Sequence, residues 1–156
     1  MPVRTLALVC LVVLASCDTA DLQNDFLEEA RRAPSGVTVT NANGAIISVD
    51  DDDWRTAPLF TGKVIVEPAY PNPVSGGLVT LPIRILQFDD VTGGLFVRAF
   101  NGSNQLITLA EALDTSSPGV YTISINPGLL SAVGLHRLFL QDFLGEIVSY
   151  GDLRIE

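Results

Sequence analysis

The chain has 156 residues, of which 18 are acidic and 9 basic, and its formal net charge at neutral pH is −9. This excess of carboxylates argues against a nucleic-acid binder, because such proteins need a face of Lys and Arg to displace counterions from phosphates. One His and two Cys leave little material for a His/Cys metal site or a His-based catalytic triad. The length corresponds to about one domain.

The first 16 residues have the pattern of a secretory signal peptide. Arg4 and the α-amino group give a positive start, and an apolar run follows from Leu6 to Leu14. This run is shorter than the roughly 20 apolar residues that a membrane-spanning helix needs. It fits the apolar core of a signal peptide, so we expect residues 1–16 to be removed during export.

The run ends in Leu14, Ala15, Ser16 and Cys17, which together resemble the lipobox of bacterial lipoproteins. The resemblance implies that Cys17 receives a thioether-linked diacylglycerol, that cleavage occurs before it, and that a fatty acid such as palmitate acylates the new amino group. The resemblance therefore implies a membrane-anchored lipoprotein of the bacterial cell envelope, in the outer membrane rather than the inner one. The alternative is ordinary signal cleavage near the same place, with Cys17 incidental.

Lipidation would also change what the two cysteines mean. Cys10 lies within the segment to be removed, and the sulfur of Cys17 would be alkylated. The mature chain would then contain no disulfide. We expect no cofactor other than the covalent lipid, which would also be the contact of the protein with the membrane.

A short tether and helix are predicted over residues 17–35. Acidic side chains come early in the stretch from Asp18, and Arg31 and Arg32 come late, which suits the helix dipole. Pro34 and Gly36 end the helical pattern. We expect a helix that spaces the body from the membrane or packs on it.

Residues 36–69 predict a β-hairpin and an acidic loop. Two β-prone stretches, 37–40 and 45–49, flank residues 41–44, in which the pair Asn43-Gly44 favours the positive φ angles of a hairpin turn. Four consecutive carboxylates follow, at Asp50, Asp51, Asp52 and Asp53. We interpret them as a solvated acidic loop, with Ca²⁺ binding as the weaker alternative because the ligand spacing of an EF-hand is absent. Trp54 is predicted to anchor this segment on the body.

The remaining sequence alternates with period two in several short runs separated by turn residues, which is typical of a β-sandwich. The candidate strands are 63–67, 81–85, 95–100, 106–109, 121–125, 135–141, 146–150 and 153–155. Pro82 lacks an N–H group, so we expect its strand at a sheet edge or bulged. In the last strand, Asp152, Arg154 and Glu156 are expected to point outward.

Residues 70–156 also carry a family resemblance. Tyr70-Pro71-Asn72-Pro73, Gly119-Val120-Tyr121, Gly134-Leu135-His136-Arg137 and Phe143-Leu144-Gly145 resemble motifs of immunoglobulin-like C-terminal domains of secreted bacterial proteins. Some of these are type IX secretion sorting domains, and others are related to flagellar hook-capping domains. The resemblance implies an immunoglobulin-like fold for residues 70–156. In the Pro-Asn-Pro segment, two fixed φ angles around a turn-forming Asn72 predict a stiff lead into the first strand.

The expected fold is therefore mainly β, an immunoglobulin-like antiparallel β-sandwich of about seven strands preceded by a short N-terminal helix. Catalytic chemistry is not evident: Asp89 and Asp90 fit a turn, and His136 has no nucleophile or second His to act with. We predict a lipid-anchored envelope protein that is not an enzyme, with an envelope protein or glycan as partner. A secreted protein with a sorting or docking sandwich is the alternative, and a carboxylate-based hydrolase is a third.

Overall fold

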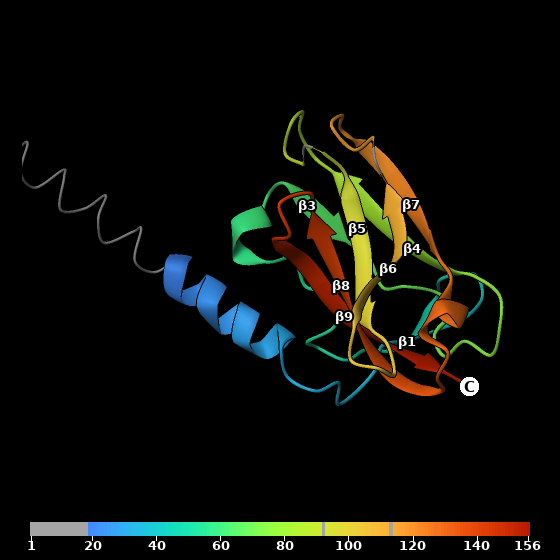
Figure 1. The fold of residues 1–156 in the computed structure, drawn as a ribbon. Helices are drawn as coiled ribbons and strands as arrows, with labels where there is room; N and C mark the ends of the chain where they lie inside the picture. Colours follow the sequence, from blue (N-terminus) through green and yellow to red (C-terminus); the bar gives the residue numbers. More distant parts are fainter. Residues whose placement is uncertain (1–18, 92, 113) are drawn as a thin grey trace, which may run out of the picture. The chain divides into compact units, whose positions relative to one another are not determined.

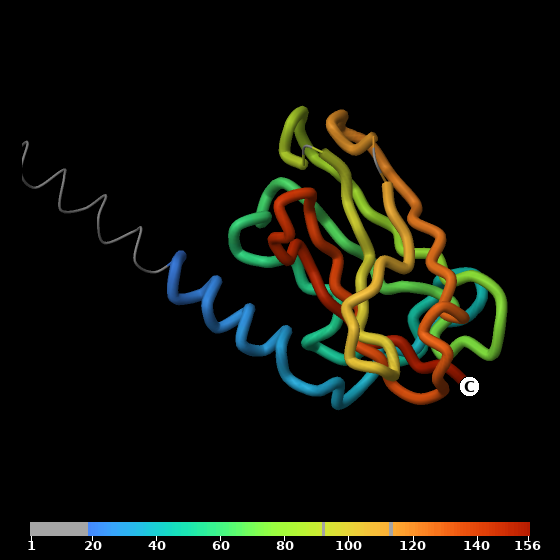
Figure 2. The backbone as a smooth tube through the Cα atoms, in the orientation of Figure 1, coloured from blue at the N-terminus to red at the C-terminus, as the bar shows by residue number. Residues whose placement is uncertain are grey.

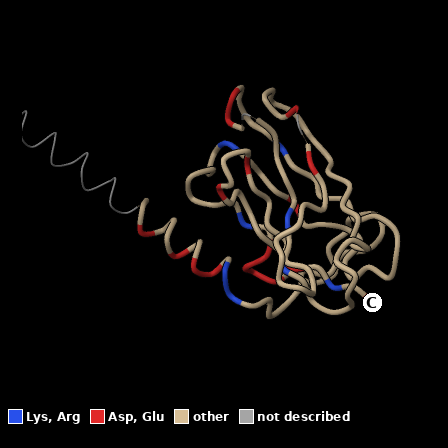
Figure 3. The backbone as a smooth tube through the Cα atoms, viewed as in Figure 1, with Lys and Arg blue, Asp and Glu red and all other residues tan. Residues whose placement is uncertain are grey.

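A computed structural model describes residues 19–91, 93–112 and 114–156. The chain divides into two compact units, of which the first ends at Arg32 and the second begins at Ala33. The described part of the first unit contains one helix, residues 19–30. Figure 3 shows acidic residues along this helix and basic residues at its end, the order that the helix dipole favours. The predicted N-terminal helix is thus confirmed. No helix among the described residues is long and apolar enough to cross a membrane.

The second unit contains an antiparallel β-sandwich of seven strands, as predicted (Figure 1). Its strands are β3 (Val64–Val66), β4 (Val79–Ile85), β5 (Leu95–Phe100), β6 (Leu106–Ala112), β7 (Gly119–Ile125), β8 (Gly134–Asp142) and β9 (Ile147–Ile155). One sheet has the order β3-β4-β7 and the other has the order β6-β5-β8-β9. The first, second and fifth strands thus pair in one sheet and the others in the second, which is an immunoglobulin-like arrangement.

The period-two pattern of the sequence positions the core. In β4, the side chains of Leu81, Ile83 and Ile85 are buried, and the intervening residues are less so. The same alternation holds in β5 and in the C-terminal half of β7. Both sheets therefore contribute every second residue to a shared interior, because successive side chains of a strand point to opposite faces.

The expected position of Pro82 is wrong. Its strand, β4, is the central strand of the three-stranded sheet. On the β3 side, the carbonyl of Pro82 accepts the N–H of Glu67 at 3.1 Å. Regular pairing with β3 ends at Val66 and Ile83, one step before the proline. The missing N–H thus falls at the end of this pairing, where Pro82 and Glu67 share one backbone hydrogen bond, so that the proline removes only the last bond of the ladder.

The last strand is longer than expected. Two candidate strands, 146–150 and 153–155, form one continuous strand, β9, which pairs with β8 along its whole length. The predicted hairpin turn between β8 and β9 is confirmed, with the N–H of Gly145 donating to the carbonyl of Asp142 at 3.1 Å.

The N-terminal hairpin of this unit is also present, formed by β1 (Val39–Thr40) and β2 (Ile46–Ser48). Its turn depends on Asn41, whose side-chain Oδ1 accepts the N–H groups of Asn43 and Ala45. Gly44 has a φ of 83°, as the Asn-Gly pattern predicted. The segment from Ala33 belongs to the same compact unit as the sandwich, and the first strand of the sandwich, β3, precedes Tyr70.

Candidate functional site

Asp53, the last residue of the acidic run, and residues 54–57 after it cover the outer edge of β9. Residues 54–57 run antiparallel beside this strand: the N–H of Trp54 donates to the carbonyl of Tyr150 at 2.6 Å, and the N–H of Ala57 donates to Val148 at 2.8 Å. Figure 2 shows these segments, distant in the sequence, next to each other. On its other side, Thr56 donates its hydroxyl to the carbonyl of Val64 in β3. The segment therefore closes the gap between the edges of the two sheets.

Further along β9, the side chain of Asp53 takes the place of a strand backbone. Its Oδ1 accepts the backbone N–H of Asp152 at 2.6 Å, and its Oδ2 accepts the N–H of Thr38 at 2.7 Å. The residue is 9% exposed. Burial raises the pKa of Asp53 to about 6, although both hydrogen bonds to backbone N–H groups favour the ionised form.

Asn72 covers the next part of the same edge of β9. Its Nδ2 donates to the carbonyls of Asp152 and Thr38, and its Oδ1 accepts the N–H of Arg154. Its own backbone pairs with Thr40. Asn72 is fully buried, and the expectation of a turn-forming residue did not include this part in covering the edge of β9. A buried amide must find partners for its donors and acceptor, and here these partners join β1, the Pro-Asn-Pro segment and β9.

A buried ion pair lies next to this edge. Arg137 donates through Nε and Nη2 to the two carboxylate oxygens of Asp152, both at 2.8 Å. Asp152 is 1% exposed, so the expectation that it points to solvent is wrong. Its side chain does point away from the sandwich interior, but the acidic segment covers it. Arg137 also lies over the ring of Tyr150, 4.7 Å from its centroid.

Burial and hydrogen bonding shift the pKa values of Arg137 and Asp52 in this cluster. Burial alone lowers the pKa of Arg137, but the hydrogen bonds and negative charge of Asp152 raise it more, so the guanidinium stays ionised. Asp52 lies 3.5 Å from Arg137. Hydrogen bonding to Asp50, followed by burial, nevertheless raises the pKa of Asp52.

The four carboxylates of the acidic run thus have separate surroundings. Asp51 is exposed, Asp50 and Asp52 are half-buried, and Asp53 is buried. Both oxygens of Asp53 already accept backbone N–H groups. Among the described residues, no three His, Cys, Asp or Glu side chains are placed to hold a metal ion together. The arrangement of Asp53 suits it to fixing backbone rather than to binding a ligand.

Trp54 anchors the segment, as the sequence analysis expected. It is 4% exposed, and its indole ring occupies the space above Gly151, where a Cβ atom on that glycine would overlap it. Trp54 has a φ of 60°, an unusual value for a bulky side chain. The anchor therefore depends on a glycine in the middle of β9, where a larger residue would not fit.

The other notable surface lies at one end of the sandwich. There, three large apolar side chains are exposed at loop tips: Phe88 between β4 and β5, and Phe143 and Leu144 between β8 and β9. Their exposed fractions are 72%, 67% and 82%. Folded proteins seldom leave such side chains together on the surface without a use for them.

Contacts between loops hold this loop end together. A Cβ built on Gly93 would come within 2.7 Å of the Cβ of Phe143, so the β4–β5 and β8–β9 loops touch. The N–H of Asp89 donates to the carbonyl of Ser116 at 2.9 Å, which joins the β6–β7 loop to them. Asp90 caps the β4–β5 turn by accepting the N–H of Gln87, in agreement with the predicted turn. Figure 3 shows acidic residues on these loop tips.

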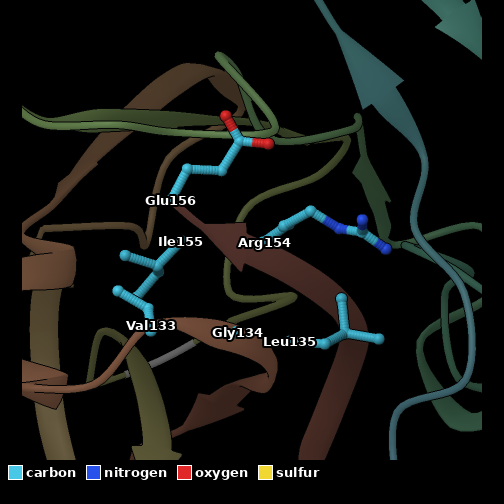
Figure 4. Close-up of a pocket in the computed structure, with 6 residues that line it drawn as sticks. All are labelled: Val133, Gly134, Leu135, Arg154, Ile155 and Glu156. Carbon is cyan, nitrogen blue, oxygen red and sulfur yellow. The ribbon is translucent and has the colours of Figure 1, made fainter.

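A shallow depression at the opposite end of the sandwich is a weaker candidate for a binding site. It has a volume of about 570 Å³ and is lined by Val133, Gly134, Leu135, Arg154, Ile155 and Glu156. In Figure 4, Val133 and Ile155 lie side by side, while the charged ends of Arg154 and Glu156 point in different directions. Its polar groups therefore do not converge on a ligand position.

Sequence reasoning located some of these residues and missed others. The lipidation motif from Leu14 to Cys17 lies outside the described residues. The ring of His136 contacts the carbonyl of Ala132 at 3.2 Å, and it has no part in the clusters above. The ion pair of Arg137 was missed because no local pattern signals a partner 15 residues away. The exposed apolar side chains of Phe88, Phe143 and Leu144 were not predicted either. Large apolar residues within turn sequences could have indicated them.

Comparisons with known proteins identify no relative of the chain. No protein-family model matches it, and neither the curated proteins nor the solved structures include a significant match. Its functional assignment therefore rests on the sequence and on the surfaces described above.

Proposed function

We propose that the protein is a lipid-anchored, non-catalytic binding module of the bacterial cell envelope. The observation that carries the binding role is the loop end, where Phe88, Phe143 and Leu144 are exposed on adjoining loops. The anchoring role is supported by the lipobox-like sequence that ends at Cys17.

The chemistry of the loop end favours a protein partner. Burying an aliphatic side chain such as Leu144 gains free energy only against another apolar surface, which a glycan offers sparingly. Carboxylates lie beside the apolar tips, among them Asp89 and Glu146. An apolar partner surface edged by Lys or Arg fits this composition, because the opposite charges steer association.

The buried ionisable groups support a non-catalytic role. Arg137, Asp152 and Asp53 are the most buried charged residues of the described chain, and all of them hold backbone or one another. Side chains that already hold backbone groups or one another have few donors and acceptors left to bind a substrate. We therefore assign the cluster to the stability of the β9 edge.

Metabolic labelling with a fatty acid tests the anchor. We expect label on the wild-type chain and none on Cys17→Ser, with a mature N-terminus at position 17 by mass spectrometry. Cys10→Ser is the matched control and should label normally. Equal label on Cys17→Ser, or an unmodified thiol at Cys17 in the native protein, contradicts lipidation.

Site-specific photo-crosslinking in cells tests the loop end. A photoreactive residue at Leu144 should form a discrete crosslinked species with an envelope protein. The same residue at Leu129, which is 49% exposed near the opposite end, should not. Phe88→Ser combined with the probe at Leu144 should reduce the yield. Equal crosslinking from both positions contradicts a binding role for the loops.

A further inference from the structure

The sandwich has four outer strand edges, and three of them are protected. Residues 54–57, Asp53 and Asn72 cover β9. The edge of β3 is three residues long and receives the hydroxyl of Thr56. The edge strand β6 carries the charged Glu111, and its pairing with β5 is interrupted by a bulge. Charges, bulges and covering segments are the usual protection of an edge against pairing with another chain.

The fourth edge, β7, lacks these devices. Its sequence from Gly119 to Ile125 is GVYTISI, seven residues with neither a charge nor a proline. Among the described residues, β7 pairs only with β4. The strand β6 comes close to β7 on this side of the sandwich, but it belongs to the other sheet, where its backbone pairs with β5. In Figure 1, β7 runs along the margin of the body.

The direction of the unpaired backbone groups follows from the ladder. Thr80 exchanges both backbone hydrogen bonds with Tyr70, so its N–H and C=O point away from β7. Backbone direction alternates along an antiparallel ladder, and Ser124 stands opposite Thr80. The N–H and C=O groups of Val120, Thr122 and Ser124 therefore point outward from the edge.

The side chains of the same three residues are also exposed. Val120 is 70% exposed, and Thr122 and Ser124 are exposed as well. They form one outward-facing row, while Ile123 and Ile125 face the core. A strand docked on this edge would thus meet free backbone groups together with small or β-branched side chains, which favour cross-strand pairing.

We propose that β7 pairs antiparallel with β7 of a second copy of this chain. The chain has a net charge of −9, so a contact between two copies is least opposed by charge repulsion where they meet at a neutral segment. β7 is such a segment. An antiparallel pair centred on Thr122 is self-complementary, because it places Thr122 opposite its counterpart and Val120 opposite Ser124, and every one of these residues has outward backbone groups.

This pairing closes on itself. The same edge serves both copies, which makes the contact isologous and joins the two three-stranded sheets into one sheet of twice the width. Because β9 is covered, the assembly would not extend into a fibre through that edge. A single edge-strand contact buries less than the ~1,200 Å² of a stable interface, so we expect a dimer that dissociates on dilution.

Cysteine crosslinking tests both the pairing and its register. The full chain with Cys10 and Cys17 replaced by Ser carries each introduced cysteine as its only thiol. Directly opposed residues have Cα atoms about 5.5 Å apart, within reach of a disulfide. Thr122→Cys should therefore form a covalent dimer under mild oxidation. Val120→Cys and Ser124→Cys should each fail alone and form a dimer when the two variants are mixed.

Sedimentation velocity over a concentration series gives the second readout. The chain with the wild-type β7, and with Cys10 and Cys17 replaced by Ser so that it carries no lipid, should move toward twice its monomer mass as concentration rises. Thr122→Lys should remain monomeric, because it sets two ammonium groups opposite each other. Thr108→Lys is the matched control on the other edge strand, β6, and should dimerise as the wild type does.

Several outcomes would overturn the proposal. One is a monomer at every concentration up to about 1 mM, combined with no crosslink from Thr122→Cys. Another is equal crosslinking from Thr122→Cys and Val120→Cys, which indicates collision rather than register. Crosslinking of Thr122→Cys to a different polypeptide, with no homodimer, would assign the edge to that partner instead.

Discussion

The carboxylate of Asp53 accepts the backbone N–H of Asp152, 99 positions further along the chain, at 2.6 Å. An outward N–H group on an edge strand bonds to water when it is exposed, but it needs a protein acceptor when it is buried. Here one side chain provides that acceptor, with a second oxygen left for the N–H of Thr38. The acidic run is thus part of the construction of the sandwich, and its most buried member connects the N-terminal hairpin to the last strand.

Replacing Asp53 by Ala should destabilise the fold. Two buried N–H groups lose their acceptor, and each unsatisfied group costs about 1–3 kcal/mol, so we expect a loss of about 2–6 kcal/mol. Urea unfolding measures it as a lower midpoint. Asp51→Ala, at an exposed neighbouring position, should change stability by less than about 0.5 kcal/mol. Similar midpoints for the two variants would contradict the assignment.

Stability should also depend on pH through Asp53. Its pKa is 3.8 in the unfolded chain and about 6 in the fold, raised by burial, so the folded state binds more protons between these values. The free energy of unfolding should therefore decrease as pH rises from about 4 to about 6, by up to roughly 3 kcal/mol at 1.36 kcal/mol per unit.

The control for this pH dependence is Asp53→Asn, which cannot titrate and should flatten the slope. Asp52 contributes in the same direction, because hydrogen bonding to Asp50 and burial raise its pKa as well. Its share is measured with Asp52→Asn. Urea titrations at several pH values give the slopes, and an unchanged slope in Asp53→Asn would assign the dependence elsewhere.

Breaking the buried ion pair should cost more than removing it. Arg137→Met leaves the buried carboxylate of Asp152 without its partner, and such a change typically costs about 3–5 kcal/mol. Adding Asp152→Leu should recover much of that loss. The exposed pair of Arg84 and Glu67 provides the comparison, since Arg84→Met should cost less than about 1 kcal/mol. Chemical denaturation distinguishes these cases, and a double variant no more stable than Arg137→Met would refute the argument.

Gly151→Ala should displace the Trp54 anchor. The new methyl group overlaps the indole ring, and overpacking of this kind costs about 1–3 kcal/mol. The fluorescence of Trp54, the single tryptophan, should shift toward that of an exposed ring. Gly102→Ala serves as the control, because nothing lies within 4 Å of the added atom. If Trp54→Ala and Gly151→Ala have additive effects on stability, the two residues do not share this contact.

The strands of the sandwich, the Asn-Gly hairpin and the N-terminal helix could all be predicted from the sequence. Each depends on neighbours within a few residues: alternation in β4, the turn preference of Asn43 and Gly44, and the charge order along residues 19–30. Trp54 was also foreseen as an anchor, because a large aromatic side chain beside a charged run needs a buried surface.

Three features could not be predicted in this way: the position of Pro82 in a central strand, the burial of Asp152 and the three partners of Asn72. Each depends on what lies across a sheet or beyond an edge, up to 99 residues away. A pattern with period two gives the face to which a side chain points, but it does not show what covers that face. The partners of a buried polar group are set by the pairing of distant strands, which no local sequence pattern contains.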